Sequence, residues 1–195
     1  MSGKRIIIMI IEAPKELTLE YEGMCLLKDF ARLVHDWLME RGYQDLAGRE
    51  DKYLESFYFE KITQKGKDIY MWWRTKRPGQ HKYIEYNINL DFDIKEVKDL
   101  EIVYKGQKLK ANSGKIKLFI RGRVIFDEKG ELEKSFFGKL FWKSFITRHY
   151  KKDLDQATRE LESDCTELMT YIKQYLEMKG FMQRVETFMP AKGLI

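Results

Sequence analysis

Residues 81–94 read HKYIEYNINLDFDI, and this stretch decides the fold class. Apolar side chains occupy every second position from Ile84 to Ile94, and Glu, Asn and Asp occupy the positions between them. Successive side chains of a β-strand point to opposite faces of a sheet, so the alternation predicts a strand with one face on a core and the other in water. Such one-sided strands are typical of antiparallel sheets.

The segments on both sides of this strand extend the same pattern. Short turns rich in Gly, Lys and Pro separate further runs of residues. In these runs apolar and polar residues alternate, or β-branched and aromatic residues are frequent. Gly66-Lys67 and Gly114-Lys115 are interpreted as hairpin turns. The predicted strands cover residues 5–11, 15–22, 53–65, 69–76, 81–94, 97–104, 109–111 and 115–126.

Two segments instead repeat apolar residues at steps of three and four, which places them on one face of an α-helix. The first is Gly23–Arg41, with Gly42 as its left-handed cap. The second is Phe136–Met178, with Gly180 as its stop. At 1.5 Å per residue the second helix would be roughly 60 Å long, so we expect a break near Gly138 or His149, or a projecting part.

The fold class predicted is α+β, a curved antiparallel sheet of about five to seven strands packed against a long C-terminal helix and one N-terminal helix. Residues 1–180 would form one domain and residues 181–195 a tail. The element order over residues 15–178 resembles the helix-grip arrangement of START-like and polyketide-cyclase-like proteins. In those proteins a curved sheet wraps a long last helix, and the resemblance implies an apolar cavity between sheet and helix.

The composition suits a globular protein, with 44% hydrophobic and 34% charged residues. Cys25 and Cys165 lie far apart at apolar helical positions, which predicts reduced, buried thiols and a cytoplasmic protein. The apolar run at residues 6–11 is too short for a signal peptide or a membrane span, and we interpret it as a buried strand. Frequent Lys, Glu, Ile and Tyr also occur in proteins of thermophiles.

No catalytic or metal-binding pattern is apparent in the sequence. The three histidines, His35, His81 and His149, lie in no recognisable nucleophile motif, and no Cys or His residues have the close spacing of a zinc site. Asp91 and Asp93 share a strand face, as solvated residues of a strand do. We therefore expect no catalytic residues, no metal and no cofactor, and favour a non-catalytic protein.

Basic residues gather in two segments that contain no acid. Residues 105–126 hold seven Lys or Arg and residues 136–152 hold five more, against a net charge of +5. Such asymmetry predicts a basic face formed by 105–123 and 139–152 that attracts polyanions such as single-stranded nucleic acid. A solvated outer sheet face is the alternative. The candidate binding residues are Lys115, Lys117, Phe119, Arg121, Arg123, Lys139, Lys143, Arg148, Lys151 and Lys152.

Two aromatic clusters are further candidates. Residues 136–145, FFGKLFWKSF, fit either an amphipathic helix on an anionic membrane surface or an aromatic plug between sheet and helix. In residues 70–74, YMWWR, the two tryptophans of a strand point to opposite faces. If Trp72 faces outward, it forms with Tyr70 and Arg74 an exposed aromatic and cationic patch or the lining of a cavity.

Three functions therefore remain open. The first is a non-catalytic binding protein, with an apolar cavity between the sheet and the C-terminal helix for a small molecule. The second is a nucleic-acid or ribonucleoprotein partner that uses the basic face. The third is an assembly protein, because the apolar positions of residues 150–176 nearly follow a heptad and could form a homo-oligomer through the C-terminal helix.

Overall fold

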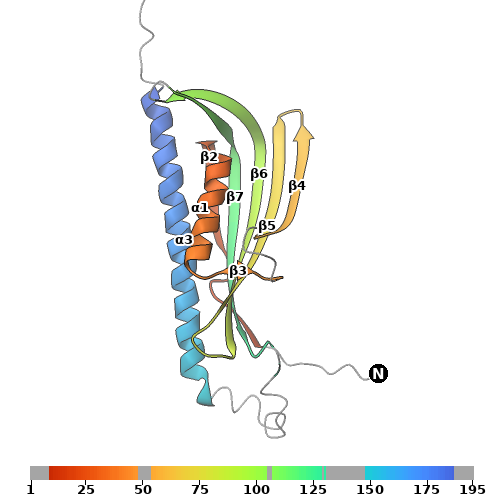
Figure 1. Cartoon of the computed structure of the whole chain (residues 1–195), viewed down its shortest axis with the longest axis vertical. Helices are drawn as coiled ribbons and strands as arrows, with labels where there is room; N and C mark the ends of the chain where they lie inside the picture. The colour runs from red at the N-terminus through yellow and green to blue at the C-terminus, as the bar shows by residue number, and fades with distance from the viewer. Residues whose placement is uncertain (1–8, 48–53, 105–106, 129, 131–147, 187–195) are drawn as a thin grey trace, which may run out of the picture.

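A computed structural model describes residues 9–47, 54–104, 107–128, 130 and 148–186. These residues form an antiparallel seven-stranded sheet and two α-helices, which confirms the predicted α+β class (Figure 1). In chain order the elements are β1 Met9–Glu12, β2 Leu17–Cys25, α1 Leu27–Glu40, β3 Gln44–Asp45, β4 Glu55–Thr63, β5 Gly66–Pro78, β6 Ile84–Tyr104, β7 Gln107–Phe126 and α3 Lys151–Glu186.

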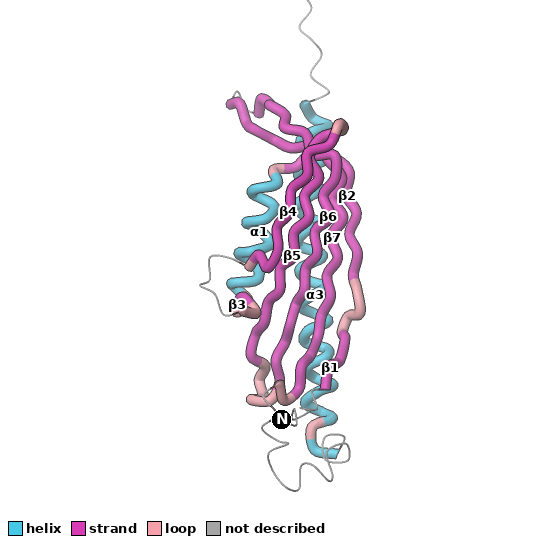
Figure 2. The backbone as a smooth tube through the Cα atoms, turned by 90° about the vertical axis from the view of Figure 1, so that its right-hand side faces the viewer, coloured by secondary structure: helices cyan, strands magenta, loops and turns pink. Residues whose placement is uncertain are grey.

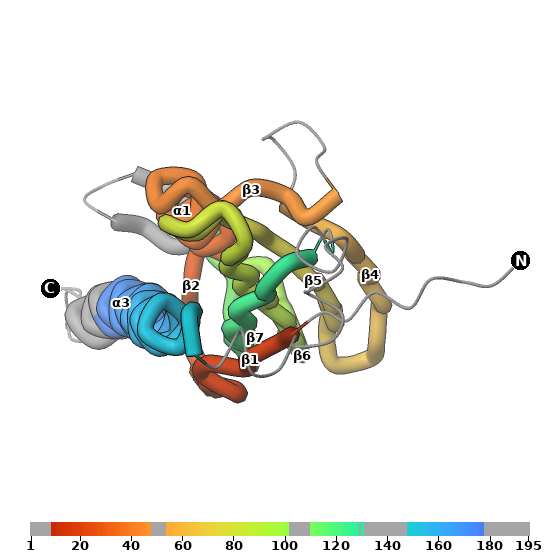
Figure 3. The backbone as a smooth tube through the Cα atoms, turned by 90° about the horizontal axis from the view of Figure 1, so that it is seen from below, coloured from red at the N-terminus to blue at the C-terminus, as the bar shows by residue number. Residues whose placement is uncertain are grey.

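The long strands β5, β6 and β7 form the centre of the sheet. β1 and β2 both pair with β7 along one edge, and β3 and β4 both pair with β5 along the other. The helices lie together behind one face of this sheet, and the opposite, outer face is free of helices (Figure 2). α3 contacts β2, β7 and β6, whereas β4 lies at the edge far from α3 (Figure 3).

The predicted separation of strands 81–94 and 97–104 is wrong, because both belong to the continuous strand β6. The separation of 109–111 and 115–126 is also wrong, because both belong to β7. Gly114 lies inside β7 rather than in a turn, and a Cβ atom there would lie 2.9 Å from the carbonyl oxygen of Lys95. This glycine therefore lets β7 pass close to β6. The irregularity lies in β6, where Glu96 has a φ of 55° and its N–H donates to the Asp68 carboxylate at 3.0 Å.

The ends of several elements differ from the prediction. α1 begins at Leu27 rather than Gly23, because Gly23–Cys25 pair with β7. The left-handed cap at Gly42 is confirmed, with φ 79°. β4 ends at Thr63 and β5 begins at Gly66, so the turn is Gln64-Lys65, two residues earlier than Gly66-Lys67.

The long helix begins directly after the break predicted near His149, and it ends later than predicted. α3 starts at Lys151 and passes through Gly180 to Glu186, so Gly180 is not a stop and the first part of the predicted tail is helical. A glycine inside a helix costs only about 1 kcal/mol, which the neighbouring turns can tolerate. The predicted helical segment 136–147, which includes the whole aromatic cluster 136–145, lies outside the described residues.

The apolar seam of α3 packs on the inner face of the sheet. Its residues Leu154, Ala157, Leu161, Cys165, Leu168, Ile172 and Leu176 are at most 5% exposed and belong to one cluster with the core residues of the strands. Burial of each large side chain contributes about 1.5–3 kcal/mol. The seam is therefore occupied within a single chain and is not available to a second helix.

Candidate functional site

Five of the nine exposed large apolar side chains among the described residues lie on β4 and β5. All eight residues from Glu55 to Ile62 are exposed. Phe57 is 39% exposed, Tyr58 50%, Phe59 48% and Ile62 83%, and Trp72 on β5 is 44% exposed. Contiguous apolar surface of this kind usually marks a contact site.

Four aromatic rings share the outer face of this hairpin. Phe57 stacks on Trp72 with ring centroids 4.3 Å apart, and Phe59 lies 6.2 Å from Tyr70. The next residue, Trp73, points to the core and is only 3% exposed. We call Phe57, Phe59, Tyr70 and Trp72 the aromatic surface.

Arg74 lies at one end of the aromatic surface but is already engaged. Its guanidinium carbon is 5.7 Å from the Trp72 ring centroid, and its Nη2 is 2.6 Å from the Asp91 carboxylate. Nη1 also donates to the carbonyl oxygens of Trp73 and Leu90 at 3.0 and 3.1 Å. Arg74 therefore supports the Trp72 ring and has little capacity left to bind a ligand anion.

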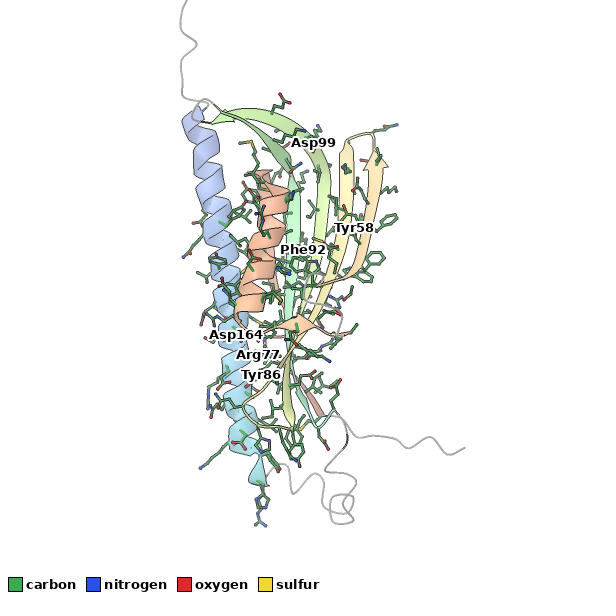
Figure 4. All side chains as sticks on the ribbon, viewed as in Figure 1. Tyr58, Arg77, Tyr86, Phe92, Asp99 and Asp164 are labelled. Atoms are coloured by element: carbon green, nitrogen blue, oxygen red, sulfur yellow. The ribbon has the colours of Figure 1, made fainter. Side chains whose placement is uncertain are left out.

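The opposite face of β4 is also uncovered. The Tyr58 hydroxyl donates to Glu60 at 2.8 Å, and Lys67 is 3.0 Å from the same carboxylate. Burial and the Glu60 hydrogen bond raise the pKa of Tyr58 to about 12, so this phenol stays neutral. Lys67 and Tyr58 hold the pKa of Glu60 below its ordinary value. Figure 4 shows Tyr58 at the edge of the molecule that is away from the helices.

The outer edge of β4 has no partner strand among the described residues, since β4 pairs only with β5. An edge strand presents unpaired N–H and C=O groups, and proteins usually protect such edges with charge, Pro or a covering element. Here three consecutive aromatics, Phe57 to Phe59, occupy both faces of the edge. The sequence interpretation missed Phe57 and Phe59, although consecutive aromatics in a strand signal apolar side chains on both faces.

The basic stripe of β7 lies on the outer face, but carboxylates of β1, β2 and β6 neutralise it. Opposite charges on facing strands stabilise a sheet and leave little net field. Phe119 lies within this stripe, with the Lys117 Nζ 5.4 Å from its ring centroid. The ion pairs are Lys115 with Glu22 and Glu96 at 3.8 and 3.4 Å, Lys117 with Glu20 at 2.7 Å, Arg121 with Glu16 at 3.9 Å and with Asp91, and Arg123 with Glu12 at 3.8 Å.

The second basic segment is only partly visible. Lys139 and Lys143 lie outside the described residues. Arg148 is exposed just before α3, and Lys151 and Lys152 are exposed at its start. None of the three forms an ion pair with another described residue. Because α3 packs on the inner face of the sheet, these three cations do not join the outer stripe into one surface.

A buried polar network, which sequence reasoning missed, fixes α3 to the sheet (Figure 4). Asp164 of α3 is 6% exposed and accepts a hydrogen bond from the Tyr43 hydroxyl at 2.7 Å. Arg41 and Arg77 approach the same carboxylate at 3.1 and 2.9 Å. The Arg77 guanidinium lies 4.8 Å from both the Tyr43 and the Tyr86 ring centroids. Every charge in the network has a partner, so its role is structural.

A hollow of about 220 Å³ lies beside this network, between the start of β6 and α3. Its lining is mostly polar, and its carboxylate Glu160 accepts hydrogen bonds from Tyr86 at 2.7 Å, Gln156 at 2.9 Å and Gln80 at 3.0 Å. These bonds, that from Tyr86 most, hold the pKa of Glu160 below its ordinary value. Because the carboxylate is already satisfied, the hollow offers a ligand little binding energy.

The described residues were also compared with the requirements of a metal site and of a reactive thiol. They contain no cluster of three or more His, Cys, Asp or Glu side chains placed to hold a metal ion. Cys25 and Cys165 are free and buried, as predicted, and burial raises the pKa of both thiols to about 12. Within the described part of the chain, neither helix has an apolar run long enough to cross a bilayer.

Comparison with protein-family models, with curated proteins and with solved structures finds no match for this chain.

Proposed function

We propose that this chain is a non-catalytic binding protein that docks an extended polypeptide segment on β4. The observation that carries the proposal is the run of eight exposed residues at a strand edge that is unpaired among the described residues, with aromatic side chains on both faces of the strand. An added strand would pair with the free backbone groups of β4 and cover its side chains on both sides. This is the β-augmentation mode of peptide recognition.

The energetics favour this surface over the interior of the molecule. Burying apolar area contributes about 25 cal/mol per Å² to the free energy of binding. Large aromatic rings bury much area while losing little conformational entropy. The apolar seam of α3 is packed in one cluster with the core residues of the strands, so a ligand that used this seam would have to displace them. On β4 a partner displaces only water.

The proposal predicts a chemical class of partner. An extended segment with alternating apolar side chains would place one set against Phe57 and Phe59 and the other against Tyr58 and Ile62. Glu60 and Lys61 would favour polar residues of either sign at the end of the segment. The rigid stack of Phe57 on Trp72 adds an ordered ring pair that needs no rearrangement.

The test is a selection of short random peptides that bind the immobilised protein, followed by titration with the fluorescence of Trp72 as readout. We expect selected peptides to bind the native chain and to lose at least about tenfold in affinity on Phe59→Ser. Ile10→Ser on β1 is the matched control, because Ile10 is 54% exposed at the opposite edge of the sheet. Equal loss in both variants, or binding that ignores Phe59, would contradict the proposal.

A nucleic-acid partner is a second candidate, supported by the exposed Arg148, Lys151 and Lys152, which form no ion pair with another described residue. Its test is a gel shift with RNA and DNA of mixed sequence at about 50 mM and about 200 mM salt, because released counterions make such binding salt-dependent. Binding at the lower salt that disappears in a variant with all three cations replaced by Gln would support it. A shift unaffected by those replacements, or no shift at all, would count against it.

A further inference from the structure

We infer that the segment docked on β4 runs antiparallel to it and carries an acidic residue opposite Lys61, followed by apolar residues opposite Phe59 and Phe57. The inference rests on the proposed function of β4 as a docking edge, and it names the chemistry of the partner. Two features carry it: the alternation of backbone groups along the edge, and the one lysine of β4, which no described carboxylate engages.

The backbone of β4 presents every second residue to its free edge. The pairing of β4 with β5 is regular from Phe57 to Thr63, and Thr63 pairs with Gly66 across a turn of two residues. Such a turn closes on a pair that exchanges backbone hydrogen bonds, and bonded and non-bonded pairs then alternate along an antiparallel ladder. The residues that present their N–H and C=O groups to an added strand are therefore Ile62, Glu60 and Tyr58.

The side chains of Phe57, Phe59 and Lys61 form the outer row of β4. Phe57 and Phe59 lie against aromatic rings of β5 on the outer face, and Lys61 follows at the same two-residue step and is exposed. Toward an added strand this row occupies the non-hydrogen-bonded positions, where facing Cα atoms lie only about 4.5 Å apart. The partner side chains opposite this row therefore contact it closely.

The charge open to a partner at this end of β4 is positive. Lys61 forms no ion pair with another described residue. Its neighbour Glu60 lies on the other face and is already engaged, by the Tyr58 hydroxyl at 2.8 Å and by Lys67 at 3.0 Å. Asp68 faces Lys61 across β5, but its carboxylate accepts a backbone N–H of β6 at 3.0 Å instead. An acidic side chain opposite Lys61 is the favourable cross-strand partner.

The direction of the partner follows from the sheet that it joins. Every strand pair of the described sheet is antiparallel, and antiparallel pairs are slightly more stable per residue than parallel ones. In an antiparallel partner the acid comes first, and the apolar residues opposite Phe59 and Phe57 stand two and four positions later. The residue just before the acid faces Ile62, which is 83% exposed, so an apolar side chain suits that position too.

Three synthetic octapeptides test the pattern. TVDTVTVT places its Asp opposite Lys61 when it runs antiparallel, and TVKTVTVT replaces this Asp by Lys. TVTVTDVT is the reversed sequence, which fits β4 only in the parallel direction. Each peptide carries a dye and is titrated with the full chain by fluorescence anisotropy at about 20 mM salt, where charge interactions are weakly screened. We expect TVDTVTVT to bind the native chain about fivefold tighter than either of the other two.

A charge reversal on the protein completes the test. Lys61→Glu should invert the preference, so that TVKTVTVT binds about fivefold tighter than TVDTVTVT. Lys28→Glu is the matched control, because Lys28 is exposed on α1, behind the inner face of the sheet, and the same change of net charge should leave the native preference in place. Circular dichroism verifies that both variants are folded.

Equal binding of the Asp and Lys peptides, or a preference that Lys61→Glu leaves unchanged, would overturn the acidic partner. Binding of the reversed peptide at least as tight as that of TVDTVTVT would overturn the antiparallel direction. If no octapeptide binds while peptides selected at random still bind through Phe59, the stated pattern is wrong and the proposed function stands. Failure of the selected peptides as well would refute the proposed function itself.

Discussion

Replacing Asp164 by Ala should destabilise the fold more than any other single loss of a charge among the described residues of α3. Asp164 is 6% exposed and is the common acceptor for Tyr43, Arg41 and Arg77. These three groups come from the end of α1, the segment after it and the end of β5. The carboxylate therefore connects the long helix to two separate parts of the molecule.

The expected cost follows from the groups that would lose their partner. Removing one member of a fully buried ion pair costs about 3–5 kcal/mol, because the other charge stays buried. Here the side chain of Arg77 is 23% exposed and that of Arg41 is 40% exposed, so both would regain part of their hydration. The Tyr43 hydroxyl would lose a bond to a charged group, worth about 1.5–3 kcal/mol. We expect a loss of about 2–4 kcal/mol in the free energy of unfolding.

Urea unfolding followed by far-ultraviolet circular dichroism measures this loss, at a concentration where the chain is monomeric. Asp155→Ala is the matched control, since Asp155 is exposed on the same helix and should change stability by less than about 0.5 kcal/mol. Tyr43→Phe should cost less than Asp164→Ala, because the two arginines keep their acceptor. A loss below about 1 kcal/mol for Asp164→Ala, with an unchanged slope of unfolding, would refute the reasoning.

Three further predictions address the core, the pH dependence and a close backbone contact. Leu161→Ala, at a position that is 0% exposed, should cost about 2–5 kcal/mol in urea unfolding, and a cost below about 1 kcal/mol would mean that the seam of α3 is not packed. The hydrogen bond from Tyr86 holds the pKa of Glu160 below its ordinary value of 4.5, so its contribution to stability is present above that pH and is lost as pH falls through the lowered value. Tyr86→Phe should therefore lower the melting temperature more at about pH 7 than at about pH 3, and an equal loss at both would contradict the coupling. Gly122→Ala should lower the melting temperature by several degrees, because its Cβ would clash with the Ala13 carbonyl oxygen, and an unchanged value would show that the segment between β1 and β2 can move away at little cost.

The sequence by itself determined the fold class and the core-facing side of α1, of the middle of β6 and of α3. The alternation in residues 84–94 predicted the one-sided strand that forms the middle of β6, and the three- and four-residue steps predicted the seam of α3. Both patterns are readable because a strand repeats every two residues and a helix every 3.6, so the position of an apolar residue reports which face is buried. The free thiols of Cys25 and Cys165 followed from the same positions.

Only the tertiary structure decided which of these faces meets a partner within the chain. The cations of β7 look like a polyanion site along the sequence, yet Lys117 lies 2.7 Å from Glu20, about a hundred residues earlier in the chain. Asp164 and Tyr43 are likewise 121 residues apart and share a hydrogen bond. Local periodicity shows which face of a strand or helix a side chain lies on. It does not show whether another element of the chain lies close enough to cover that face. That is why β4 emerges as an open aromatic edge while the apolar seam of α3 proves to be fully occupied.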